Sequence, residues 1–168
     1  MQRDILVILF IAVVAIMIGA GVFFYGEKGS ISLAPSGGVA AAVVPFDALV
    51  HGMNSSVPTR TNYLITSSAE FEVLWSMLDA TGTPPAINFS THNVVAVFAG
   101  RKPTGGYGIS VSKIEDKTRR MVTITLRNPA KDCMLTQQVT EPYELVIVPK
   151  TALPFTHEDV AATANCGE

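Results

Sequence analysis

The 168-residue sequence has few of the residues from which catalytic and metal sites are usually built: two cysteines, three histidines and one tryptophan. The cysteines do not form a Cys-x-x-Cys pair, and the histidines are too far apart for a metal-ligand motif. A Gly-x-Ser-x-Gly elbow and a Gly-Lys-Ser/Thr phosphate loop are also missing. We therefore expect a non-enzymatic protein that uses no metal and no cofactor.

Charge is also scarce. The chain has 12 Lys and Arg against 14 Asp and Glu, for a net charge of −2. Since binding to nucleic acid depends on a basic surface, we expect no nucleic-acid partner. In contrast, 48% of the residues are hydrophobic and the mean hydropathy is +0.36.

One segment accounts for this hydropathy. Residues 5–25 form an apolar run interrupted only by Gly19 and Gly21. At about 1.5 Å per helical residue, this run is long enough to cross the roughly 30 Å hydrocarbon core of a bilayer. We expect residues 1–25 to be an uncleaved membrane anchor, with Tyr25 at the interface. The alternative is a cleaved signal segment and a secreted domain.

The sequence after the anchor changes character twice. Residues 26–42 are rich in Gly, Ser, Ala and Pro and show no periodic apolar face, which indicates a flexible linker. Residues 43–168 are predicted to form the folded domain. We expect this domain on the extracytoplasmic side of the membrane.

The predicted domain is mostly strand. Alternating or continuous apolar patterns predict strands at 44–50, 60–66, 93–99, 107–114, 121–126 and 143–148. Ser67 and Glu70 have the spacing of a helix capping box. The apolar residues that follow them, with helical spacing, are Phe71, Leu74, Trp75 and Leu78.

These patterns predict a mainly β (α+β) fold. We expect a small antiparallel sheet or sandwich-like domain curling around one packed helix, preceded by a single transmembrane helix. Cys133 and Cys166 are predicted to form a disulfide that ties the C-terminal tail to the domain, consistent with an oxidising compartment. Two free thiols in a cytosolic domain are the alternative.

The most distinctive local sequence connects the predicted strands 93–99 and 107–114. Its proline fixes one φ angle, and its paired glycines permit positive φ. We predict that it binds a protein or peptide partner, although a simple strand connection would also account for it. Its residues are Gly100, Arg101, Lys102, Pro103, Thr104, Gly105, Gly106 and Tyr107.

The pattern Val-Val-Ala-Val-Phe-Ala-Gly-Arg-Lys-Pro-Thr-Gly-Gly-Tyr, at residues 94–107, resembles the PrcB C-terminal domain family. The segment Thr-Glu-Pro-Tyr-Glu-Leu-Val-Ile-Val-Pro-Lys, at residues 140–150, is similar to the closing strand of that family. The family takes its name from a subunit of a surface protease complex, and its members are typically anchored or secreted. The resemblance implies a non-catalytic, extracytoplasmic accessory or binding domain, and by analogy with the family's name its partner is a component of a protease complex.

A second resemblance concerns one loop. Residues 103–107, Pro-Thr-Gly-Gly-Tyr, are similar to the Pro-Thr-Thr-Gly-Tyr loop of chagasin-like cysteine-protease inhibitors, with Gly105 in place of a threonine. The Arg-Pro-Trp loop of those inhibitors has no close counterpart here, since residues 141–143 are Glu-Pro-Tyr. The alternative function that this resemblance implies is inhibition of a cysteine protease by an inserted loop.

Overall fold

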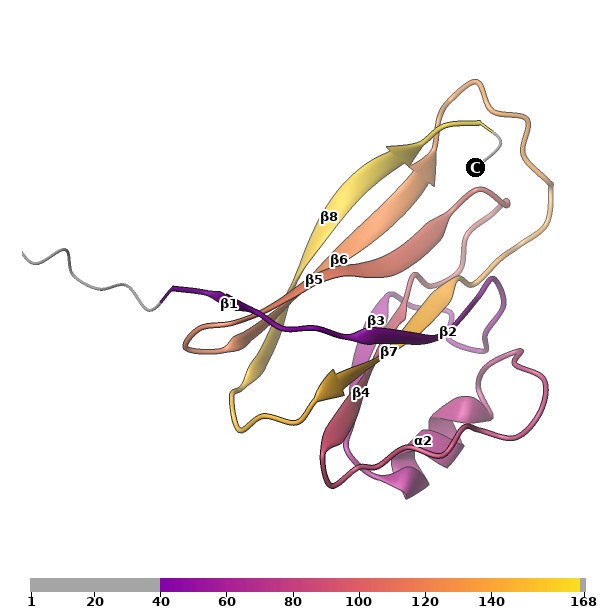
Figure 1. Ribbon diagram of the computed structural model, residues 1–168. Coiled ribbons are helices and arrows are strands. Elements are labelled where there is room, and N and C mark those ends of the chain that lie inside the picture. The colour runs from indigo at the N-terminus through magenta and orange to yellow at the C-terminus, as the bar shows by residue number, and fades with distance from the viewer. Residues whose placement is uncertain (1–39, 167–168) are drawn as a thin grey trace, which may run out of the picture. The chain divides into compact units, whose positions relative to one another are not determined.

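A computed structural model describes residues 40–166, which lie in one compact unit, Val39–Glu168. The predicted membrane anchor and residues 26–39 of the predicted linker lie outside the described residues. Within 40–166, no helix is long and apolar enough to cross a membrane. The described part is mainly β, with two four-stranded sheets and one short helix (Figure 1).

The first sheet has the strand order β1-β5-β6-β8. Adjacent strands in this sheet are antiparallel, except for β6 and β8, which are parallel. The expectation of an antiparallel sheet is therefore wrong for this pair. The strand bounds are β1 Ala42–Val43, β5 Gly108–Asp116, β6 Arg120–Pro129 and β8 Phe155–Ala164.

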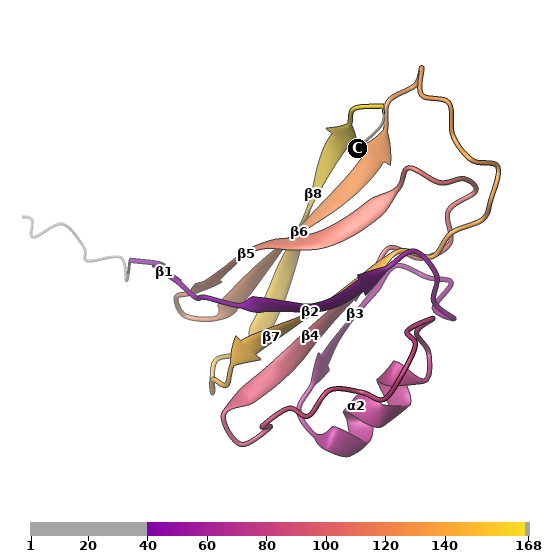
Figure 2. The same ribbon diagram turned by 45° about the vertical axis from the view of Figure 1, so that its right-hand side comes forward.

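The second sheet has the order β2-β7-β4-β3 and is antiparallel throughout. Helix α2, Ser68–Trp75, packs on the face of this sheet that is turned away from the first sheet (Figure 2). The prediction that one sheet curls around the helix is therefore wrong. The strand bounds are β2 Asp47–Gly52, β3 Thr61–Ile65, β4 His92–Phe98 and β7 Tyr143–Pro149.

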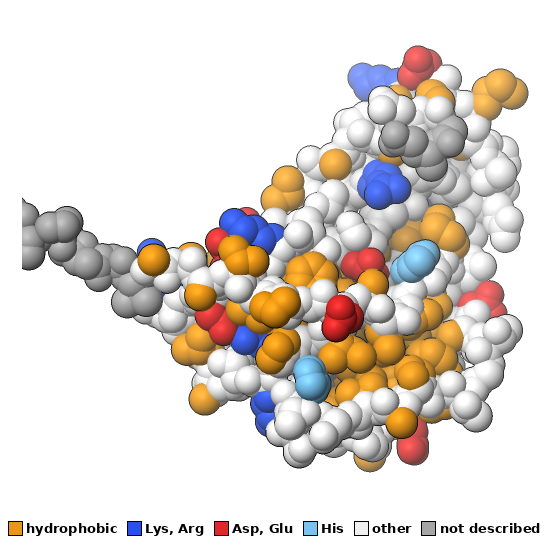
Figure 3. Space-filling model, in the orientation of Figure 1, with side chains coloured by type: hydrophobic (Ala, Val, Ile, Leu, Met, Phe, Trp, Pro, Cys, Tyr) orange, Lys and Arg blue, Asp and Glu red, His pale blue; other side chains and the backbone are white. Residues whose placement is uncertain are grey.

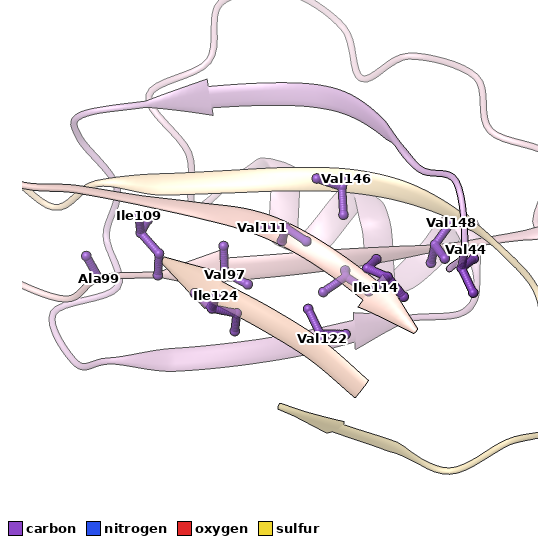
Figure 4. Packing of buried hydrophobic residues seen from close by; sticks show 11 residues of the cluster. Val44, Val97, Ala99, Ile109, Val111, Ile114, Val122, Ile124, Val146 and Val148 are labelled. Carbon is purple, nitrogen blue, oxygen red and sulfur yellow. The ribbon is translucent and has the colours of Figure 1, made fainter. Parts of the chain in front are cut away.

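Strand β4 is apolar from Val94 to Phe98 because both of its faces are covered there. Val95 and Val97 point into the core between the two sheets, whereas Val94 and Phe98 pack in the layer beneath α2. Figure 4 shows the inter-sheet core, in which small branched side chains from both sheets meet. The predicted strand at 93–99 is confirmed as β4.

The predicted helix start is confirmed. Ser67 is the N-cap, and its side chain accepts a hydrogen bond from the Glu70 amide. The Glu70 carboxylate accepts from the Thr66 amide at 2.8 Å, which lowers the pKa of Glu70. The capping box therefore reaches one residue further back than the usual reciprocal pair.

Two segments differ from their predictions. The predicted strand 44–50 is divided, since Val44 donates to Ile114 of the first sheet and β2 begins in the second sheet only at Asp47. Pro45, which has no amide hydrogen, lies at this change of sheet. No strand is predicted at β8, because its sequence, Phe-Thr-His-Glu-Asp-Val-Ala-Ala-Thr-Ala, has neither an alternating nor a continuous apolar pattern.

Candidate binding site

Residues 100–107 carry the chain from β4 in the second sheet to β5 in the first. The crossing begins at Gly100, which has a φ of 72°. A Cβ atom at this position would lie 2.8 Å from the Arg60 nitrogen and 2.8 Å from the Thr59 carbonyl carbon. Both the angle and the close approach of the backbone require glycine here.

The crossing is fixed to the segment that precedes β7. Lys102 and Thr140 exchange two main-chain hydrogen bonds, of 2.8 and 3.1 Å. The Gly105 amide donates to the Thr136 carbonyl at 3.0 Å, and Gly105 is buried. These hydrogen bonds fix the loop against the body of the domain, which favours a preformed binding site over a freely projecting inhibitory loop. The inhibitor function stays a prediction.

Both cations of the crossing have partners. Arg101 Nε lies 2.9 Å from Glu141 Oε1, and Lys102 Nζ lies 5.6 Å from the centre of the Tyr107 ring. The Arg101 side chain is 65% exposed, so this ion pair contributes little to stability. The Lys102 contact holds the aromatic ring at the point where the chain enters β5.

Tyr107 forms part of a cleft of about 400 Å³. The cleft is lined by the end of β2 and the starts of β5 and β7, where Figure 1 shows the two sheets diverging. The first sheet contributes Arg127, and the second contributes His51 and Glu144. Met53, which follows β2, also lines the cleft and is 43% exposed. The cleft therefore combines apolar contact area with charges of both signs.

Glu144 is the half-buried acid of this cleft. One carboxylate oxygen accepts the Val111 amide at 2.6 Å, close to the point where a register shift interrupts β5 between Val111 and Lys113. Burial raises the pKa of Glu144, while the Val111 amide and nearby His51 act in the opposite direction. His51 is the direct cross-strand partner of Glu144.

A second hollow, of about 320 Å³, adjoins the cleft on the other side of β2. Trp75, Asp79 and Ala80 line its far side, while His51 and Met53 line both hollows. Figure 3 shows apolar side chains gathered on this face below β2, towards the segment that follows α2. The two hollows share His51, Gly52, Met53 and Tyr143, and we treat them together as one candidate site, which we call the β2 site.

Tyr143 lies between the two hollows and lines both. Only 3% of it is exposed, and burial raises its pKa, with a further contribution from the charge of Asp79. A Cβ atom on Gly52 would lie 2.6 Å from the Tyr143 ring. Glycine at this position is what allows the ring to lie under the end of β2.

The structure separates the predicted loop residues into two groups. Gly106 and Tyr107 line the cleft, whereas Gly100 to Gly105 shape or fix the crossing. The sequence patterns missed His51, Met53 and Glu144. Glu144 could have been found, because it occupies the inward position of β7 that Val146 and Val148 continue.

The predicted Cys133–Cys166 disulfide is confirmed, with the Cα atoms 5.1 Å apart. It joins the segment after β6 to the end of β8. Strand β8 pairs with β6 along its whole length but is mostly exposed. The disulfide therefore fixes the C-terminal end of a strand that makes few buried contacts.

The fold and site define a β-sandwich domain with one covering helix and a cleft beside a glycine-rich crossing. Residues 93–149, about a third of the chain, match the family model described as PrcB C-terminal. This match runs from β4 to the end of β7 and confirms the resemblance to the PrcB C-terminal family. No curated protein and no solved structure matches the chain.

Proposed function

We propose that the protein is a non-catalytic, membrane-anchored accessory subunit that binds a component of a protease complex on the extracytoplasmic side. The observation that carries this proposal is the position of Tyr107. Within residues 93–149, which match the family model, the most distinctive sequence is the loop that ends at Tyr107. Tyr107 lines a preformed cleft. A protein-binding role therefore has a concave surface on which it can act.

The chemistry of the β2 site suits a peptide segment of a protein partner. Met53 and Tyr107 offer apolar contact area, while Glu144 and Arg127 can pair with charged or hydrogen-bonding groups. The glycines and the paired loop segments fix the surface before binding, so that little conformational entropy is lost on association.

The proposed location rests on two observations. The apolar run at residues 5–25 has the length and composition of a membrane anchor. The Cys133–Cys166 disulfide supports an oxidising environment for the domain, since disulfides persist outside the reducing cytosol.

The test compares two exposed methionines changed in the same way. Met53→Asp places a charge in the β2 site, and the matched control Met134→Asp places one at a fully exposed position outside both hollows. Each tagged full-length chain is recovered from solubilised membranes of its own host, and the recovered proteins are identified by mass spectrometry.

We expect wild type and Met134→Asp to recover a protease component, and Met53→Asp to lose it. Equal recovery by Met53→Asp would remove the β2 site from the proposal. If wild type itself recovers no protease component, the accessory function is wrong.

A further inference from the structure

Strand β3 forms an open edge of the second sheet, on the side opposite to β2. Among the described residues it pairs only with β4. The Ala99 amide donates to the Pro142 carbonyl, which fixes the alternation along β4: odd-numbered residues bond to β7 and even-numbered residues bond to β3. The main-chain groups of Asn62 and Leu64 therefore point outward from the sheet.

The next outward amide, that of Thr66, already has a partner in the Glu70 carboxylate. The open part of the edge is thus confined to Asn62 and Leu64, with two amide donors and two carbonyl acceptors. These four main-chain groups are sufficient to form hydrogen bonds with a short added strand.

The other substantial edges have features that discourage pairing. Strand β2 has a register shift between Ala48 and Val50, and β8 carries Glu158 and Asp159. Charges and bulges of this kind are how natural sheets protect their edges. Strand β3, with the sequence Thr-Asn-Tyr-Leu-Ile, has a regular register, no charge and no proline.

Hollows flank β3 on both of its faces. One, of about 430 Å³, lies between β3 and α2 and is almost entirely apolar; Tyr63, Val73 and Met77 are among its lining residues. The other, of about 180 Å³, lies on the sandwich face beside Leu64 and Phe155. Since side chains alternate along a strand, an added strand would direct successive side chains towards these two hollows.

The exposed apolar side chains and the charges at this edge indicate what would fit. Tyr63 and Leu64 are each 39% exposed, and Val73 is 59% exposed. Glu70, exposed on α2, lines the hollow on this side, and α2 carries no basic residue. The nearby cation, Arg60, is already paired with both carboxylate oxygens of Asp159, at 3.0 and 2.7 Å. The helix side of the edge is therefore apolar and acidic.

We propose that the open edge of β3 binds an extended segment of a partner protein as a fifth strand of this sheet. The segment has alternate apolar side chains and flanking Lys or Arg residues that face the acidic helix. Main-chain hydrogen bonds to Asn62 and Leu64 supply affinity, and the two hollows supply specificity. This surface lies at the opposite edge of the sheet from the β2 site and does not depend on it.

The experiment uses the full-length chain in a mild detergent and a fluorescent peptide, Lys-Thr-Val-Thr-Val-Thr-Lys, whose Lys and Val side chains lie on one face of an extended strand. One control peptide has Glu in place of both Lys residues, and another, Lys-Thr-Thr-Val-Val-Thr-Lys, keeps the composition without the alternation. Binding is measured by anisotropy, and protection of the Leu64 amide is measured by hydrogen exchange.

Leu64→Pro removes an outward amide that β4 does not use, and Leu64→Val is its matched control. We expect Leu64→Pro to weaken binding of the alternating basic peptide about tenfold, the loss expected for one or two hydrogen bonds. Leu64→Val should bind nearly as wild type, and both control peptides should bind more weakly. Val73→Glu, at an exposed helix position, should also weaken binding and tests the same edge without altering the strand.

The proposal fails if the peptide leaves exchange of the Leu64 amide unchanged, or if both Leu64→Pro and Val73→Glu bind it as wild type does. It also fails if the chain forms a dimer that Leu64→Pro abolishes, because a second copy then occupies the edge. Met53→Asp, which alters the β2 site, should leave peptide binding at β3 unchanged. A failure of the β3 proposal can therefore be distinguished from a failure of the β2 site.

Discussion

Arg120 provides the most demanding test of how the sandwich is closed. Its side chain is only 3% exposed and makes a bidentate pair with Asp116, with both contacts at 2.7 Å. It also donates to the Pro149 carbonyl in the other sheet and lies 5.5 Å from the centre of the Phe155 ring. Replacing it with methionine keeps an apolar stem but leaves the carboxylate and the carbonyl without their donor.

The expected cost follows from the burial of the two partners. Removing one member of a buried ion pair typically costs about 3–5 kcal/mol. Asp116 is 24% exposed and regains some water, which lowers the expected cost for Arg120→Met to about 2–3 kcal/mol. With a typical dependence of stability on urea, the unfolding midpoint should fall by about 1 M or more.

The assay is urea unfolding of the full-length chain in a mild detergent, followed by fluorescence of Trp75, the single tryptophan. Arg119→Met is the matched control, since Arg119 is exposed and adjacent. A loss of under about 0.5 kcal/mol, or equal losses in the two variants, would refute the role assigned to Arg120.

The pH dependence of this difference has a definite sign. The hydrogen bonds from Arg120, followed by its charge, lower the pKa of Asp116 below the usual 3.8 despite some desolvation. A lowered carboxyl pKa stabilises the fold above the unfolded pKa, and this contribution is lost as the pH falls through the folded pKa. The stability difference between wild type and Arg120→Met should therefore shrink below about pH 4.

Three further changes give distinct results. Burial raises the pKa of Glu144 above 4.5, so the stability that protonated Glu144 contributes is lost as the pH rises through the raised pKa. Glu144→Gln should therefore match the stability of wild type near pH 4 and exceed it near pH 7. A stability difference in urea titrations that stays constant with pH would contradict this. Changing Cys133 and Cys166 together to serine should lower stability by up to about 3.7 kcal/mol for a separation of 33 residues; unchanged urea midpoints would show that the bond constrains little. Gly100→Ala should lower the free energy of unfolding by about 2 kcal/mol or more. The loss should clearly exceed that of Gly82→Ala, since Gly82 also has a positive φ but a Cβ there would meet no atom within 4 Å. Equal shifts in the thermal midpoint would contradict a backbone clash at Gly100.

Local patterns in the sequence were sufficient for most of the elements. The Ser67 cap, the continuous apolar run of β4 and the alternation of β5 and β6 each depend on neighbouring residues, so they can be recognised without tertiary information. The disulfide could be predicted because only two cysteines are present and one lies near the chain end.

The missed features depend on contacts between distant segments. The polar strand β8 is held by parallel pairing with β6 and by a disulfide, neither of which its own sequence indicates. Arg120 resembles a solvated turn residue until the Pro149 carbonyl is placed beside it. The β2 site likewise joins His51 to Glu144, which are far apart in sequence and opposite each other across two strands.

The most direct test of the proposed function is photocrosslinking from position 107. The full-length chain carries p-benzoylphenylalanine in place of Tyr107, with the exposed residue Lys117 replaced in the same way as a control. Irradiation of intact cells should give an adduct with a protease component from position 107 and none from position 117. No adduct from position 107, or the same adducts from both positions, would contradict a protein-binding role for the crossing.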